Sequence, residues 1–395
     1  YEIRLSLVGS EMCIRDRVKG LLDAVGNYGW AVVLFTVILK IITLPLDFWQ
    51  RFSMKKNAKM MSELAPIMAK LDKAYANDKN KLNQEKQKLY KKHGYNMLSG
   101  CLPMIVTMTI FFVMFGGLNQ CSAYVNLKVY SELSVHYTDT LSAELSKHTE
   151  EYESRRYDIL LSGKSTAIED YKTWLGGQGV EESAFDAEIS AATSRISQIK
   201  AEAQAEARKA VGEFYLEAKE GFLWITNISR PDTWVESFPE TAEKFTGTLT
   251  KKYREYKDEF DSELYGEIYK GISEQGVGYK VGDKHWNGLM ILPVLSIALS
   301  FLSTFISNKT SKKKNGEEQQ LDPNAAAAQS SNKVMMFVMP VIMGVFGFVY
   351  TATFALYMVC SSLLSILFTL AMNPIIDRRI AKIESKVEKP DYRRK

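Results

Sequence analysis

The sequence predicts an all-α integral membrane protein with five transmembrane helices and a large, mostly helical segment outside the membrane. Three stretches contain no Lys, Arg, Asp or Glu: 97–118, 285–308 and 334–376. A fourth apolar stretch, 28–48, carries one charge in its middle, at Lys40. About 20 apolar residues are enough for a helix to cross the ~30 Å hydrocarbon core of a bilayer. These stretches exclude a single soluble globular domain, although the average composition, 46% hydrophobic and 24% charged, is ordinary.

The length of each apolar stretch sets the number of spans. Three helices are predicted at 28–48, 99–118 and 287–307, and the 43 uncharged residues of 334–376 predict two more, which turn near 350–353. We expect 1–17 to be non-native. The first half of the chain then contains the N-terminal region and first span at 18–50, a cytoplasmic helical hairpin at 51–96 and the second span at 97–118. An external segment at 119–286 is followed by the third span at 287–307, a cytoplasmic loop at 308–333, the fourth and fifth spans at 334–372, and a basic cytoplasmic tail at 373–395.

The distribution of Lys and Arg sets the predicted orientation, because short cytoplasmic segments carry an excess of these residues. Segment 51–96 has 12 Lys or Arg and 4 Asp or Glu, the loop 308–333 has 5 and 3, and the tail 373–395 has 8 and 4. Segment 119–286 has the opposite balance, 20 against 30. With five spans, the N-terminus and 119–286 are predicted to be external and the C-terminus cytoplasmic.

The polar segments carry helical patterns. In 51–96, apolar residues recur at 61, 64, 68, 71 and 75, as on one face of a helix. A turn is expected at 76–78, and 81–93 is expected to form the returning helix. This pair of helices can be a solvated structural element, a partner-binding element, or both. In 119–286, the Ala- and Glu-rich stretch 182–220 and the weaker candidate 141–175, separated by Gly-rich 176–179, predict an external helical hairpin. The pattern of 233–284 supports no assignment.

The sequence contains none of the common catalytic or nucleotide-binding motifs: no HExxH, Walker-type loop, Rossmann glycine pattern or nucleophile elbow. The four His lie on different segments, and the four Cys form no paired framework. The net charge of +4 is too small to indicate nucleic acid. The prediction is therefore a protein that is not an enzyme and has no cofactor and no metal site.

Lys40 is the most informative residue, because it lies roughly 16–18 Å along a helix from both Tyr28 and Arg51. A Lys at this depth costs about 2.5–3.5 kcal/mol on insertion scales. Asp47 lies near the cytoplasmic end of the same span, so no acidic partner is expected within the membrane. Lys40 is thus predicted to face a water-filled cavity; a local tie to backbone or hydroxyl groups is the alternative. Hydroxyls on other spans are consistent with a polar groove: Thr107, Thr109, Ser296, Ser300, Ser303, Thr304, Ser361, Ser362, Ser365 and Thr369.

Several motifs resemble those of the YidC-type membrane protein insertases, the YidC/Oxa/Alb family. They are NYGWAVVLFTVILKIITLPL, FSMKKNAKMMSELAPIMAKLDKAY, GCLPMIVTMTIFFVMF, GFLWITNISRPD, MILPVLSIALSFLSTF, MMFVMPVIMGVFGF and LYMVCSSLLSI. The resemblance is to the Gram-positive-like five-span form with an enlarged external segment. It covers the five spans, the hairpin and the FLWI segment, and leaves out 119–220 and 233–286.

The resemblance implies five helices around a hydrophilic groove that is open to the cytoplasm and to lipid. It assigns the single groove charge, usually Arg, to Lys40. The candidate lining residues are Thr36, Thr107, Ser303, Thr304, Tyr357, Ser361 and Ser362. The usual Pro-Gly turn between the last spans, the Trp after Tyr357 and the third-span Gln residues are replaced here, so the lining differs from the family pattern.

The resemblance also implies a function: guiding hydrophobic segments of nascent proteins into the bilayer of the bacterial cell membrane, without nucleotide hydrolysis. The implied partners are nascent membrane proteins with short acidic external tails, the ribosome through the basic hairpin and C-terminal tail, the Sec translocon, and the lipid bilayer. Two alternatives remain. A transporter or channel predicts paired intramembrane charges or broken helices in related halves. A multi-pass surface protein predicts that the external segment binds a partner.

Overall fold

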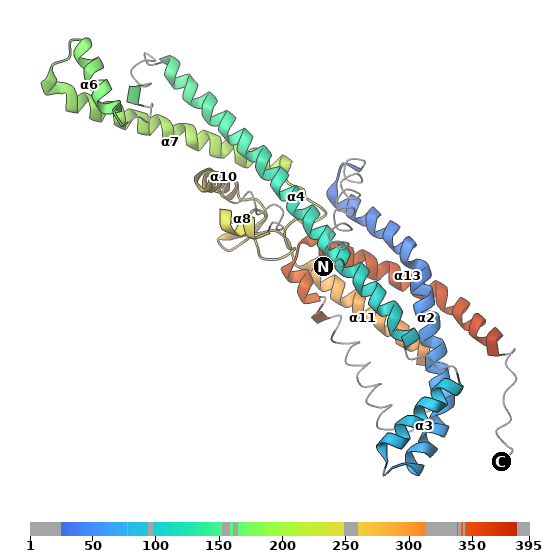
Figure 1. Cartoon of the computed structure of the whole chain (residues 1–395). Helices are drawn as coiled ribbons and strands as arrows, with labels where there is room; N and C mark the ends of the chain where they lie inside the picture. The colour runs from blue at the N-terminus through green and yellow to red at the C-terminus, as the bar shows by residue number, and fades with distance from the viewer. Residues whose placement is uncertain are drawn as a thin grey trace. The chain divides into compact units, whose positions relative to one another are not determined.

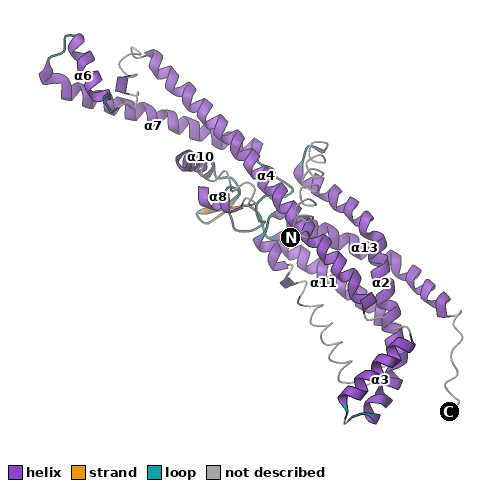
Figure 2. Cartoon of the chain, in the orientation of Figure 1, coloured by secondary structure: helices purple, strands orange, loops and turns teal. Residues whose placement is uncertain are grey.

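The computed structural model describes residues 25–76, 78–93, 98–151, 159–160, 165–248, 260–312, 338, 341–342 and 344–384. The predictions for 1–17, for most of the loop 308–333, for part of the fourth span and for the end of the tail lie outside these residues. The described chain is mostly helical (Figure 2) and divides into two compact units. Unit 1 comprises Tyr1–Ser122, Ile228–Thr233 and Gly288–Lys395, and unit 2 comprises Ala123–Asn227 and Trp234–Asn287.

Unit 1 contains the apolar helices. They are α2 (Tyr28–Ala74), the first part of α4 (Leu98–Glu151), α11 (Ile291–Lys312) and α13 (Ala352–Glu384). Helix α13 packs against both α2 and α11 (Figure 1). Three described helical segments are long and apolar enough to cross a membrane, Tyr28–Asn57, Met108–Lys147 and Ala352–Ile383, and Ile291–Ile306 is a shorter apolar helix. The structure confirms an all-α integral membrane protein, and the count of five spans stays a prediction.

The hairpin predicted at 51–96 forms, and its first helix is a direct continuation of the first span. Helix α2 is unbroken from Tyr28 to Ala74, although Pro45 and Pro66 lie inside it. Helix α3 (Lys79–Lys92) returns after a turn, and the Asp78 side chain caps it by accepting from the Lys81 N–H at 3.0 Å. No helix end therefore separates the span from the hairpin.

Side chains of both helices hold this hairpin together. Leu64, Met68 and Leu82 are buried between them. Lys86 pairs with Asp72 at 2.6 Å, and the Tyr90 hydroxyl donates to the Met68 sulfur at 3.2 Å. The 3-4-3-4 spacing of the sequence thus marks the face on which the two helices meet.

A short segment of unit 1, Ile228–Thr233, supplies partners for the first N–H groups of α13. The N–H of Ala352 donates to the Arg230 carbonyl at 2.8 Å, and the N–H of Thr353 donates to the Ile228 carbonyl at 3.0 Å. The first turn of a helix leaves its N–H groups without intrahelical acceptors. Here backbone carbonyls more than 100 residues away in sequence provide them.

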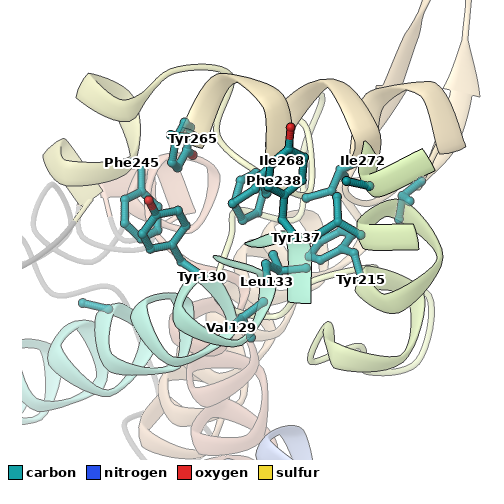
Figure 3. Close-up of a cluster of buried hydrophobic side chains, with 14 residues drawn as sticks. Val129, Tyr130, Leu133, Tyr137, Tyr215, Phe238, Phe245, Tyr265, Ile268 and Ile272 are labelled. Atoms are coloured by element: carbon teal, nitrogen blue, oxygen red, sulfur yellow. The ribbon is translucent and has the colours of Figure 1, made fainter. Parts of the chain in front are cut away.

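Unit 2 contains the second part of α4, α6 (Ala167–Gly177), a short 3₁₀ helix (Glu182–Ala184), α7 (Phe185–Ala218), α8 (Ala242–Thr248), α10 (Ser262–Gln275) and a two-stranded antiparallel sheet, β1 (Tyr279–Val281) and β2 (Lys284–Trp286). Its core is largely aromatic (Figure 3). Val129, Tyr130, Leu133 and Tyr137 of α4 face Tyr215 of α7, Phe238, Phe245 of α8, and Tyr265, Ile268 and Ile272 of α10.

Among the described residues of 119–286, the helical pair that the sequence predicts makes contact only near the beginning of α7. Helix α7 forms within 182–220, and Tyr171 and Leu175 of α6 pack against its Ala192. The rest of α7 packs instead against α10, which lies in the stretch 233–284 that the sequence pattern left unassigned. Helix α10 is only 14 residues long and is flanked by aromatic and Gly-rich sequence, so its local signal is weak.

Candidate functional site

The charged group in the first span has an acidic partner. Lys40 donates to the Asp47 carboxylate at 3.1 Å, and their side chains are only 17% and 15% exposed. The expectation that Lys40 lacks such a partner is therefore wrong. The two residues are seven apart, close to two turns of an α-helix, so they lie on one face. The flexible Lys side chain can extend along the helix toward the more polar end.

A second cation lies next to this pair. Arg51 follows Asp47 by one helical turn, is partly buried, and interacts electrostatically with the Asp47 carboxylate. We call Lys40, Asp47 and Arg51 the charged triplet. Positions four apart on a helix are neighbours on its surface. The carboxylate of the triplet thus lies between two cations on one face of α2.

Helix α13 presents polar side chains to the same region. Tyr357 is buried, and its hydroxyl is hydrogen-bonded to Ser361. Tyr357 also interacts electrostatically with the Asp47 carboxylate. Farther along, the hydroxyls of Ser362 and Ser300 are 3.4 Å apart and connect α13 with α11. Asp47 thus pairs with Lys40 and interacts electrostatically with Tyr357, which is hydrogen-bonded to Ser361.

Other predicted lining residues bond within their own helices. Thr36 is fully buried and donates to the Val32 carbonyl at 2.7 Å, and Thr304 donates to the Ser300 carbonyl at 2.9 Å. Such back-bonding is ordinary for hydroxyl residues in helices. Ser303 is partly exposed, and the side chain of Thr107 lies outside the described part of the chain. These residues keep a lining role only as a prediction.

The beginnings of α2 and α13 meet in a neutral hydroxyl network. Tyr28 and Ser122 have their hydroxyl oxygens 3.5 Å apart, and Ser122 donates to Thr353 at 3.3 Å. Thr353 in turn donates to the Ile228 carbonyl at 3.0 Å, and the oxygens and side chains involved are buried. Lys40 lies roughly 18 Å farther along α2. The beginnings of α2 and α13 are therefore joined by neutral hydrogen bonds, and the charged triplet lies farther along α2.

An additional ion pair ties α2 to α13. Lys55 donates to Asp377 at 3.0 Å, and the Arg379 guanidinium lies 5.3 Å from the centre of the Phe48 ring. Sequence reasoning missed Asp47 and Arg51 as site residues and Asp377 as the partner of Lys55. The spacing of Asp47 and Arg51 from Lys40 could have revealed the first two, whereas Asp377 is 322 residues from its partner and left no local signal.

The cavity in unit 2 is too small to be a ligand site. Its volume is about 40 Å³, and Glu236, Tyr269 and His285 contribute to its lining. The Tyr269 hydroxyl donates to Glu236 at 2.7 Å, and burial together with this carboxylate raises the pKa of Tyr269 to about 12. Within the described residues, no group of three or more His, Cys, Asp or Glu could hold a metal ion.

Comparison with known proteins covers most of unit 1 and part of unit 2. The family model described as 60Kd inner membrane protein matches residues 20–160 and 209–379, well over half of the chain. The unmatched stretch between them contains α6 and most of α7.

Individual relatives match over shorter lengths. "Membrane protein insertase YidC" of Helicobacter pylori (strain ATCC 700392 / 26695) is 43% identical over 95 residues, which are 24% of this chain and 17% of the relative. The proteins of the same name from Fusobacterium nucleatum and Caldanaerobacter subterraneus are 44% and 40% identical over 96 and 100 residues, about a quarter of this chain and 45% and 47% of the relatives. Each match therefore spans less than half of the relative's length. Together with the helical bundle and its charged first span, these findings show that the chain belongs to the 60Kd inner membrane protein family, the family of the YidC insertases.

Proposed function

We propose that this protein is a membrane protein insertase, which guides hydrophobic segments of nascent proteins into the bilayer through a hydrophilic groove carrying Lys40. The observation that carries the proposal is a Lys ammonium in the middle of an apolar helix, paired with Asp47, whose charge also acts on Tyr357 of α13. The relatives named as insertases support membrane insertion as the type of activity.

The proposed mechanism needs only electrostatics and partitioning. An acidic tail that precedes a hydrophobic segment is attracted to Lys40, and the attraction is stronger in a site of reduced dielectric. The hydrophobic segment then enters lipid, which contributes about 25 cal/mol per Å² of apolar surface removed from water. This transfer supplies the driving force, so the proposal includes no nucleotide hydrolysis.

The proposed setting is a bacterial cytoplasmic membrane, with the N-terminus and 119–286 outside and the C-terminus inside. The basic hairpin supports a ribosome contact, because Lys and Arg attract RNA phosphates without reading sequence. It carries 12 Lys or Arg within 51–96. The Sec translocon is a further proposed partner.

A transporter or channel is the second candidate, and the Lys40–Asp47 pair is the observation that favours it. Paired intramembrane charges are a feature of ion and proton pathways. The expectation that Lys40 has no acidic partner is wrong and therefore does not count against this candidate. Family membership still favours the insertase.

The test is insertion into proteoliposomes that contain the full chain. The client has one hydrophobic segment preceded by a short acidic tail, and protease protection of the tail measures insertion. Lys40→Ala is expected to reduce insertion at least several-fold, and Lys40→Arg is expected to retain it. Lys55→Ala, which removes a different cation of α2, serves as the matched control. Full insertion by a correctly folded Lys40→Ala protein would overturn the proposal. An ion flux across the same proteoliposomes in the absence of client would support the transporter.

A further inference from the structure

The charged triplet contains a carboxylate, although the proposed mechanism needs only a cation. The Asp47 carboxylate accepts from the Lys40 ammonium at 3.1 Å, and both side chains are mostly buried. Lys40 is thus occupied by a carboxylate of its own helix. The client group that the proposed function brings to Lys40 is also a carboxylate.

Two carboxylates compete for one ammonium in such a place. Lys has three N–H donors, but two carboxylates that share them repel each other strongly when water is limited. A client carboxylate must therefore displace Asp47 from Lys40. The cost of this displacement decides which clients the site accepts.

Arg51 keeps that cost low. It lies one turn beyond Asp47 on the same face of α2 and already interacts with its charge. A carboxylate released from Lys40 can pair with Arg51, so it is not left buried without a cation, which would be costly. The ion pair of Lys55 with Asp377, which joins two helices, provides a comparison pair at a similar distance of 3.0 Å.

We infer that Asp47 is a specificity-determining residue: it occupies Lys40 in the resting protein, moves to Arg51 when a client carboxylate arrives, and so favours clients with several acidic residues over clients with one. This inference rests on the proposed insertase function and names a substrate preference within it. The recognised chemistry is a short polypeptide tail bearing two or more carboxylates.

The test uses three clients that differ only in the tail, which carries no Asp, one Asp or three Asp. Asp47→Asn is expected to raise insertion of the one-Asp client about fivefold, the order of effect of losing one such ion pair. The neutral client should be unchanged, and the three-Asp client should gain less than the one-Asp client. Asp377→Asn is the matched control and should leave the preference among the three clients unaltered. Membrane abundance and protease resistance of each variant check folding.

Double variants distinguish competition for the Lys40 ammonium from simple repulsion between Asp47 and the client tail. In a Lys40→Ala background, Asp47→Asn should give no gain, because there is no ammonium to compete for. An equal gain in that background would overturn the inference and leave only a repulsive role for Asp47. Arg51→Gln should lower insertion of the one-Asp client, and adding Asp47→Asn should restore it to the level of Asp47→Asn alone.

Failure of the inference and failure of the proposed function give different results. If Lys40→Ala inserts all three clients as well as the unaltered protein, the proposed function fails. If Lys40→Ala is impaired but Asp47→Asn does not change the preference among tails, only the role of Asp47 fails.

Discussion

The carboxylate of Asp232 accepts a hydrogen bond from the backbone N–H of Leu292 at 2.8 Å, across 60 residues of sequence. Its other oxygen accepts from the N–H of Met290 at 3.1 Å, and the side chain is fully buried. Asp232 thereby caps the beginning of α11 from another part of the chain. Gly288 lies directly against this carboxylate, where a Cβ atom would overlap it.

Loss of this cap is expected to destabilise unit 1. Asp232→Ala removes the acceptor for two N–H groups and should lower the free energy of unfolding by about 1–3 kcal/mol. Asp232→Asn, which keeps one acceptor oxygen, should cost less. Thermal unfolding of the purified protein in detergent measures both variants, and Asp283→Asn at an exposed turn is the control. Equal stability of Asp232→Ala and the unaltered protein would contradict the capping role.

The crossing of α7 and α10 depends on Gly271. A Cβ atom at this position would overlap the backbone carbonyl of Arg208, so Gly271→Ala must push the two helices apart. We expect it to cost about 1–3 kcal/mol in the stability of unit 2. Gly266 lies on the same helix with open space around it, and Gly266→Ala should be neutral or stabilising by up to ~1 kcal/mol. Thermal unfolding compares the two, and the reverse order of stability would exclude close packing at Gly271.

The partly buried hydrogen bond of Tyr269 should make unit 2 sensitive to high pH. The pKa of this phenol is raised from the ordinary 10.0 to about 12, mainly by burial and then by Glu236. Because the folded state holds the proton more tightly, the stabilisation is complete below pH 10 and is lost as the pH rises from about 10 to about 12. The absorbance of tyrosinate during a pH titration, with Tyr269→Phe as the reference, measures it. Ionisation of Tyr269 together with the exposed tyrosines would contradict the prediction.

Residues 160–189, which we call the distal part of unit 2, are expected to be dispensable for insertion. Residues 160–189 contain α6 and the start of α7 and fall outside the family match except for the first of them. Replacing them with a Gly/Ser linker of equal length should leave insertion within about twofold, because they lie outside the aromatic core. Replacing 200–218 should instead unfold unit 2, because Ala207, Val211 and Tyr215 are fully buried in that core. Protease protection of the client and limited proteolysis of unit 2 measure the two effects. Lost insertion with an intact core would assign the distal part a role in function.

The hairpin of α2 and α3 is expected to be a mobile element that faces clients. Its contact face is short, contains the adaptable Met68 and carries the Lys86–Asp72 pair and the Tyr90–Met68 hydrogen bond. Hydrogen exchange of the protein in nanodiscs should be fast at 60–90 and should slow when a ribosome carrying a nascent membrane segment is added. Slow exchange in the free protein, unchanged by the ribosome, would identify a rigid brace.

The sequence by itself determined the class of the protein, the apolar helices and the hairpin. The uncharged runs and the 3-4-3-4 spacing at 61–75 report directly which residues need an apolar environment, and this information is local. The depth of Lys40 follows from counting residues along one helix. The spacings of Asp47 and Arg51 on that helix are also local, so the charged triplet lay within reach of sequence reasoning even though the pairing of Lys40 was predicted wrongly.

Only the tertiary structure decided which faces meet. The Ala- and Glu-rich composition of 182–220 predicts helix α7, but it does not show that α10 covers one face of this helix, with Gly271 at the crossing. The same is true of Asp377 beside Lys55 and of Asp232 at the beginning of α11, since each pair is brought together by the fold and not by spacing along one element. A buried polar group needs a partner, but the sequence around it does not identify that partner, because the bond depends on the packing of segments that lie 60 to 322 residues apart.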